Sequence, residues 1–189
     1  MSDDAVSRYP VPALEDLPPD LRTRITEVAE RSGFVPNVFL AMAHRPDELR
    51  AFLAYHDALM ERESGLSKAE RELIVVVTSA ANDCLYCVVA HGAILRIRSK
   101  RPQLADQVAV NWRGADLSDR ERAICRAATV LATDPVTFGD EHRDELRAAG
   151  LSDEDVWDLG AVTAFFALSN RMAHLTEMRP NDEFYTMGR

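Results

Sequence analysis

Three residues in the middle of the chain have the types and the spacing for thiol chemistry: Cys84, Cys87 and His91. On an α-helix they occupy positions i, i+3 and i+7, and at about 100° per residue all three project from one side. The two thiols then lie one turn apart and can close a disulfide. A histidine one turn beyond Cys87 can reach that sulfur and take up its proton. The pattern predicts either a redox pair or half of a metal site.

The thiols are expected at the start of their helix, where thiolates are stabilised. Asn82 and Asp83 have the character of a helix cap, which would leave free N–H groups and the positive end of the helix dipole near both sulfurs. Such surroundings lower a cysteine pKa from about 8.5 to between roughly 3.5 and 7.5. We expect Cys84 to be the more exposed thiol, available to an outside dithiol, and Cys87 to have His91 within direct reach.

A zinc site is not favoured by the remaining residues. Zinc commonly takes four ligands, from two CxxC pairs or from a CxxC and an HxxxH. This chain has one CxxC, and its remaining cysteine, Cys125, is expected to be inert packing. The other histidines are separated from one another: His44, His56, His142 and His174. We therefore expect no bound metal or cofactor.

Length and composition predict one folded domain without nucleic-acid or membrane partners. The 189 residues are 47% hydrophobic and 28% charged, as in folded soluble chains. The net charge of −9 disfavours a phosphate backbone or an anionic membrane surface as partner. No apolar run approaches the ~20 residues of a membrane span, and the acidic start Met1-Ser2-Asp3-Asp4 does not resemble a secretory signal. A cytoplasmic location is expected.

The chain divides into an arm and one helical domain. Residues 1–19 hold four of the nine prolines and are predicted to form an extended arm, able to lie across a neighbouring subunit. Residues 20–189 have helical periodicity almost throughout, which predicts a single all-α domain. Helices are expected at 20–31, with Asp20 as cap, and at 37–43, 46–62, 68–81, 84–98, 103–110, 119–132, 140–149 and 153–178, the last bent near Gly160. The apolar faces of 46–62 and 153–178 exceed what one core needs, which predicts a symmetric homo-oligomer.

Three helix starts share one capping pattern, at residues 66–70, 117–121 and 151–155. Each has Leu, then Ser as N-cap, then an acid three residues later, which is the capping box with a possible hydrophobic staple. The first box settles the doubtful stretch 73–78, which is β-branched and strand-like by propensity but is expected to be a buried helix. The likeness also fits a degenerate internal duplication of a helical unit, although good capping alone could produce it.

The chain contains a motif made of Glu72, eleven residues, Cys84-x-x-Cys87, three residues and His91. This motif is similar to that of the alkyl hydroperoxidase D (AhpD)-like proteins of the carboxymuconolactone decarboxylase superfamily. Two further segments and the Pro-rich arm resemble the peroxidase-related branch of this superfamily. The segments are Phe34-Val35-Pro36-Asn37 and Ser169-Asn170-Arg171-Met172-Ala173. The resemblance implies an all-helical AhpD-like bundle that assembles into trimers or hexamers. It also implies an antioxidant enzyme that reduces hydroperoxides without a bound cofactor, with electrons from an external thiol or dithiol partner protein.

The resemblance further implies a role for each residue of the motif. Cys87 would attack the peroxide, and Cys84 would convert the resulting sulfenic acid to a disulfide. His91 would act as base toward the attacking thiol, and Glu72 would complete the proton relay. The founding hydroperoxidases carry a histidine between the cysteines, where this chain has Tyr86. A tyrosine, with a pKa of about 10, is a poor base near neutrality, so the resolving step or the exchange with reductant is expected to differ.

Two other functions stay open from the sequence. The CxxC could be a redox sensor or a structural feature of a non-catalytic helical oligomer. Glu72 and His91 could instead act as acid and base without the thiols, as in a decarboxylase-like enzyme. Because the chain has no Gly-rich phosphate loop and no dinucleotide fingerprint, electrons from a nicotinamide must come through a partner.

Two weaker candidates lie outside the motif. His56 shares the apolar face of its helix and is either a core or interface residue or part of a pocket wall. Asn170, Arg171 and His174 fall on one face of the last helix, which fits a polar interface or a pocket wall.

Overall fold

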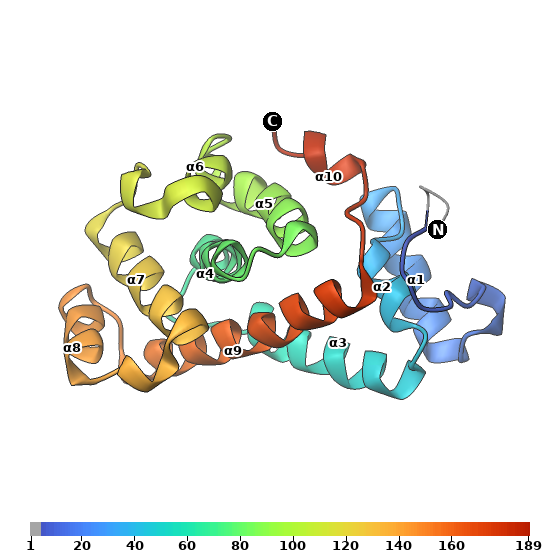
Figure 1. Ribbon diagram of the computed structural model, residues 1–189, viewed down its shortest axis with the longest axis horizontal. Helices are drawn as coiled ribbons and strands as arrows, with labels where there is room; N and C mark the ends of the chain where they lie inside the picture. Colours follow the sequence, from blue (N-terminus) through green and yellow to red (C-terminus); the bar gives the residue numbers. More distant parts are fainter. Residues whose placement is uncertain (1–4) are drawn as a thin grey trace.

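The computed structural model describes residues 5–189, so the acidic start Met1–Asp4 lies outside the described residues. Residues 5–189 form ten α-helices and three short 3-10 helices without a strand, which confirms the all-α prediction (Figure 1). The central helix is α4 (Lys68–Ala81), which packs against α5 (Leu85–Ser99), α7 (Asp119–Thr133) and α9 (Asp153–Thr176). The site residues are therefore carried by the helix at the centre and by two of its neighbours.

The predicted helices are all present, with ends that differ by a residue or two. The other elements are α1 (Pro19–Ser32), α2 (Asn37–Met42), α3 (Pro46–Met60), α6 (Leu104–Asn111), α8 (Asp140–Ala148), α10 (Glu183–Thr186) and the 3-10 helices Leu14–Asp16, Trp112–Gly114 and Pro135–Thr137. The short α10 was not predicted. α9 continues as one helix past Gly160 without a break.

The three capping boxes are confirmed at the starts of α4, α7 and α9. At α4 the Ser67 hydroxyl accepts the Glu70 N–H at 3.2 Å, and the Glu70 carboxylate accepts the Ser67 N–H at 2.8 Å. Glu70 also binds Arg120 of α7 at 2.6 Å, so this cap ties two helices together. The β-branched stretch 73–78 that follows is helical and buried, as predicted.

The start of α1 corrects one prediction. The helix begins at Pro19 with Pro18 as N-cap, so Asp20 is not the cap. Proline suits the first helical position because it has no N–H to leave unpaired. The Asp20 carboxylate instead pairs with Arg50 at 2.6 Å, and this hydrogen bond lowers the pKa of Asp20 to about 2. Gly33, at φ 85°, ends α1 in the left-handed conformation.

The described part of the arm lies against its own chain. The Arg8 N–H donates to the Thr176 carbonyl at 2.7 Å, and the Arg179 N–H donates to the Val6 carbonyl at 3.3 Å. The Arg8 side chain also pairs with Glu177. The arm is therefore held along the C-terminal end of α9, and a further contact with a neighbouring subunit stays a prediction.

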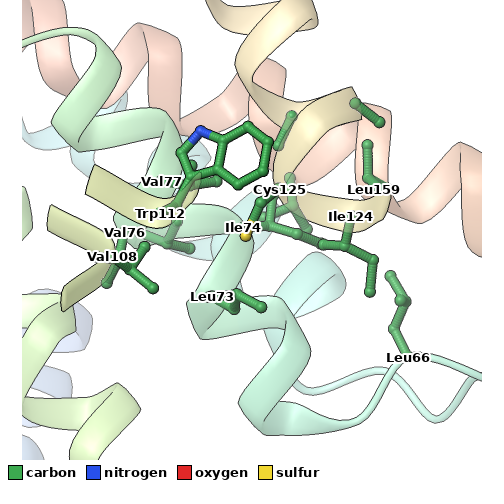
Figure 2. Packing of buried hydrophobic residues seen from close by; sticks show 14 of the residues in the cluster. Leu66, Leu73, Ile74, Val76, Val77, Val108, Trp112, Ile124, Cys125 and Leu159 are labelled. Carbon is green, nitrogen blue, oxygen red and sulfur yellow. The ribbon is translucent and has the colours of Figure 1, made fainter. Parts of the chain in front are cut away.

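The main core surrounds α4. Figure 2 shows Leu73, Ile74, Val76 and Val77 among Trp112, Ile124 and other apolar side chains of the surrounding elements. Cys125 belongs to this core, is completely buried, and has a pKa raised to about 12 by that burial. Its expected packing role agrees with this placement. No helix among residues 5–189 is both long and apolar enough to cross a membrane.

Candidate active site

Cys84 is itself the N-cap of α5. Its sulfur accepts the Cys87 backbone N–H at 3.4 Å, and its own N–H donates to the Ser79 carbonyl at 2.9 Å. The residue before it, Asp83, has a φ of 53°, in the left-handed region that non-glycine residues seldom adopt. This corrects the expectation that Asn82 and Asp83 would cap the helix. The tight turn between α4 and α5 places a sulfur where a serine or aspartate oxygen is usual.

Both thiols are buried, which corrects the expectation that Cys84 would be the more exposed. Each cysteine exposes only 1% of its surface. They differ in what they face, because Cys84 lines a cavity of about 330 Å³ and Cys87 does not. The cavity is bounded by Asp83, Cys84, Leu85, Tyr86, Ala173, His174, Glu177, Met178, Arg179 and Pro180. A small molecule in this cavity would therefore meet Cys84 first.

The two thiols have opposite pKa shifts. The pKa of Cys84 is lowered to about 7, chiefly by a hydrogen bond from the Cys87 thiol and also by the Cys87 N–H and by the charge of His174. The pKa of Cys87 is raised well above its usual range because its thiol donates to Cys84 and because it is buried. Cys84 is therefore the more acidic of the two thiols. The expected lowering of pKa at the helix start applies to Cys84 alone.

Glu72 and His91 form a close pair. The His91 Nδ1 lies 2.8 Å from the Glu72 carboxylate. Because a carboxylate accepts, this nitrogen carries the hydrogen. The His91 ring also packs edge-on against Phe166 of α9, with centroids 4.7 Å apart. The predicted partnership between α4 and α5 is thus present as a side-chain hydrogen bond.

His91 does not hydrogen-bond Cys87, which corrects the expected direct contact. Within residues 5–189 the sulfur of Cys87 instead lies 3.9 Å from the Ser169 hydroxyl. The helical spacing places His91 and Cys87 one turn apart, but the bond to Glu72 fixes the imidazole toward α4. The sequence could place the two side chains on one face without giving the direction of the ring.

Tyr86 and His56 have different positions relative to the thiols. Tyr86 is buried, its hydroxyl accepts the Val38 N–H at 3.0 Å, and burial raises its pKa well above the usual range. It therefore anchors α5 to α2 and cannot act as a base near neutrality.

His56 packs near Phe166, with ring centroids 6.4 Å apart, and its pKa is lowered by burial and by the charge of His91. It belongs to the side of the molecule that holds Glu72 and His91.

Sequence reasoning left three contacts of α9 unassigned. Ser169 lies against Cys87, and the completely buried Asn170 donates to the Ser79 hydroxyl at 3.0 Å. The His174 Nε2 lies 2.9 Å from the Asn82 carbonyl. The sequence predicts that Asn170 and His174 share a helix face. The fold shows that this face meets the turn before Cys84. Polar residues four positions apart on an otherwise apolar helix are the signal that could have found them.

The structure offers no metal-binding cluster in the described part of the chain. No group of three or more His, Cys, Asp or Glu side chains within residues 5–189 is placed to hold an ion. A second cavity, of about 240 Å³, lies between the arm, α2, α3 and the end of α9, and its lining contains no cysteine. The chemistry that the described side chains can perform is therefore centred on the dithiol.

Comparisons with known proteins identify the family and the fold. The model of the carboxymuconolactone decarboxylase family matches residues 46–129, which include both cysteines. A solved structure from Ralstonia eutropha JMP134, described as an alkylhydroperoxidase AhpD core and an uncharacterized peroxidase-related protein, is 60% identical. It covers 98% of this chain and 97% of its own, with a TM-score of 0.97. An uncharacterized peroxidase-related protein from Silicibacter sp. TM1040 is 38% identical over 100% of this chain and 99% of its own, with a TM-score of 0.94.

The chain also has a more distant structural likeness to a protein with a different activity. The debrominase Bmp8 is 21% identical over 100% of this chain and 98% of its own, with a TM-score of 0.79. At this identity the likeness concerns the fold alone. No curated protein matches the chain.

Proposed function

The chain belongs to the AhpD-like, peroxidase-related proteins of the carboxymuconolactone decarboxylase superfamily, and from this we propose that it is a thiol-dependent peroxidase. The observation that carries the proposal is the state of the dithiol. Cys84 accepts hydrogen bonds from Cys87, has a pKa of about 7 and lines a cavity. A thiolate that faces a cavity is the nucleophile that an O–O bond requires.

In the first step the Cys84 thiolate attacks the terminal oxygen of a hydroperoxide. The S–O bond forms as the O–O bond breaks, and the sulfur loses two electrons to the peroxide. The alkoxide leaves with a proton from water, which gives an alcohol and a sulfenic acid on Cys84. This order reverses the one that the family resemblance implies, because the thiolate and the cavity are both at Cys84.

In the second step Cys87 closes the disulfide. Its sulfur attacks the Cys84 sulfenic acid, the S–S bond forms as the S–O bond breaks, and the Cys87 proton is passed to the leaving oxygen, which departs as water. We assign the transfer of that proton to His91, which lies one turn along α5 and is oriented at Nδ1 by Glu72. Because the ring does not bond Cys87 in the reduced pair, the transfer requires the ring to turn or a water to intervene. An external dithiol then attacks the disulfide at Cys84, the sulfur that faces the cavity, and restores the reduced pair.

The experiment that tests this function is peroxide turnover with a dithiol. Purified protein with excess dithiothreitol should consume cumene hydroperoxide over many cycles. Turnover should be lost in both Cys84→Ser and Cys87→Ser and kept in Cys125→Ser, the matched control. Consumption of a single equivalent would indicate a redox sensor. Activity on another substrate that survives in the Cys84→Ser, Cys87→Ser double variant would indicate acid–base chemistry by Glu72 and His91.

The assembly proposal is a symmetric homo-oligomer built through α9 and α3. Large apolar side chains on these helices stay exposed in the single chain: Trp157 73%, Leu168 52%, Leu175 55% and Tyr55 50%. Large apolar side chains that stay exposed on the same helices are candidates for burial in an interface. Light scattering at micromolar concentration tests the assembly, and a monomer there would contradict it.

A further inference from the structure

Helix α9 holds the turn that carries Cys84 at three points. The Asn170 amide donates to the Ser79 hydroxyl at 3.0 Å and accepts from the Asn82 amide at 3.2 Å. One turn further along α9, His174 binds the Asn82 carbonyl at 2.9 Å. Because that carbonyl accepts, the His174 Nε2 carries the hydrogen.

The turn between α4 and α5 needs such support. Asp83 has a φ of 53° although it is not glycine, and such a conformation persists where surrounding contacts enforce it. Asn82, directly before it, has bonds to both α9 residues, and the Cys84 N–H returns to Ser79. The position of the Cys84 sulfur therefore depends on α9.

The Asn170 side chain is buried where α9 meets the turn. Its amide nitrogen has two hydrogens, and the Ser79 hydroxyl takes one of them. The side chain is completely buried, so its second hydrogen has no access to bulk water. Asn170 also contributes to lowering the pKa of Cys84.

We propose that Asn170 and His174 are positioning residues of the dithiol, which hold the turn before Cys84 and thereby fix the place of its sulfur. This proposal and the proposed function concern the same dithiol, but the proposal does not require peroxidase activity.

Several charged or titratable groups surround Cys84. His174, Glu177 and Arg179 line the cavity from α9 and the segment after it, Asp83 precedes Cys84, and Cys87 and Tyr86 come from α5. Glu177 is already paired with Arg8 of the arm. His174 lowers the pKa of Cys84 by its charge, so its neutral replacement should raise that pKa.

The test measures thiol reactivity without any peroxide. The reduced protein is alkylated with iodoacetamide across a pH series, and the rate at Cys84 is followed by peptide mass spectrometry. The variants are His174→Gln, which can still donate to Asn82 but has no charge, and Asn170→Asp, which keeps the shape and replaces the donor by a carboxylate. The matched controls are His142→Gln on α8 and Asn111→Asp at the end of α6.

The expected results differ between the variants. Asn170→Asp should raise the apparent pKa of Cys84 by about one to three units, which slows alkylation at pH 7 about tenfold or more. His174→Gln should raise it less, and His174→Ala should add a loss of protection from proteolysis at the turn. The controls should keep the parent profile.

A parent-like pH profile in both Asn170→Asp and His174→Gln would overturn the proposal. If Asn170→Asp does not fold, His174→Gln decides alone, because His174 is an exposed residue whose replacement leaves the core intact. Shifted profiles in a protein that does not turn over peroxide would keep this proposal and refute the peroxidase function instead.

Discussion

The Cys87 backbone N–H donates to the sulfur of Cys84 at 3.4 Å, so the two cysteines are unequal before any substrate arrives. The Cys87 thiol donates to the same sulfur and lowers its pKa. Cys84 is therefore the more acidic member of the pair, and Cys87 is the less acidic one.

Removal of the Cys87 thiol should make Cys84 less acidic. In the parent, alkylation of Cys84 should rise with pH through a midpoint at about 7, since only the thiolate reacts. In Cys87→Ala the midpoint should move upward, because no side-chain donor to the Cys84 sulfur remains at this position. Cys125→Ser is the control and should leave the midpoint unchanged. A parent midpoint near the ordinary cysteine value would contradict the unequal pair.

The order of attack can be determined from the two single variants. Cys87→Ser should react with one equivalent of peroxide and stop as a sulfenic acid on Cys84, which dimedone traps. Cys84→Ser should react far more slowly, since the pKa of Cys87 is raised by burial as well as by Cys84. Equal or faster trapping on Cys87 in Cys84→Ser would restore the order that the family resemblance implies.

His91→Gln should slow closure of the disulfide. Loss of a general base commonly costs roughly 10²–10⁴-fold in rate, so the Cys84 sulfenic acid should accumulate where the parent shows only disulfide. Glu72→Gln should have a smaller effect because it acts through His91. His56→Gln provides a comparison from the same side of the molecule. Closure at the parent rate in His91→Gln would remove His91 from the mechanism.

Arg71 should be important for stability and unimportant for the thiols. It is completely buried and binds Asp158 of α9 at 2.9 Å and the Leu59 carbonyl at 2.6 Å. Arg71→Ala leaves a buried carboxylate without this partner and should lower the free energy of unfolding by about 3–5 kcal/mol. Arg62→Ala removes a half-exposed partner of the same Asp158 and should cost less than about 1 kcal/mol. Urea denaturation measures both, and equal losses would contradict this account.

Local patterns predicted most of the fold. The three Ser-x-x-acid boxes, the prolines at helix starts and Gly33 each act within a few residues, so the sequence is enough to place those helix ends. The capping box also predicted correctly that the β-branched part of α4 is helical, against its propensity.

The candidate site was predictable only in part. Helical spacing placed Cys84, Cys87 and His91 on one face, and the partnership of His91 with Glu72 came from the family resemblance. The direction of the His91 ring and the equal burial of the thiols depend on packing against α4 and α9. Asn170 and His174 lie far along the chain from the cysteines, and only the tertiary fold brings them to the turn.

The most direct test of the central claim is a single turnover of the reduced parent with one equivalent of cumene hydroperoxide. Intact mass and peptide mapping are followed alongside peroxide loss. The account predicts that the protein loses the mass of two hydrogen atoms and gains a Cys84–Cys87 cross-linked peptide as the alcohol appears, and that a dithiol reverses the change. Peroxide consumed without that cross-link, or both thiols left intact, would contradict it.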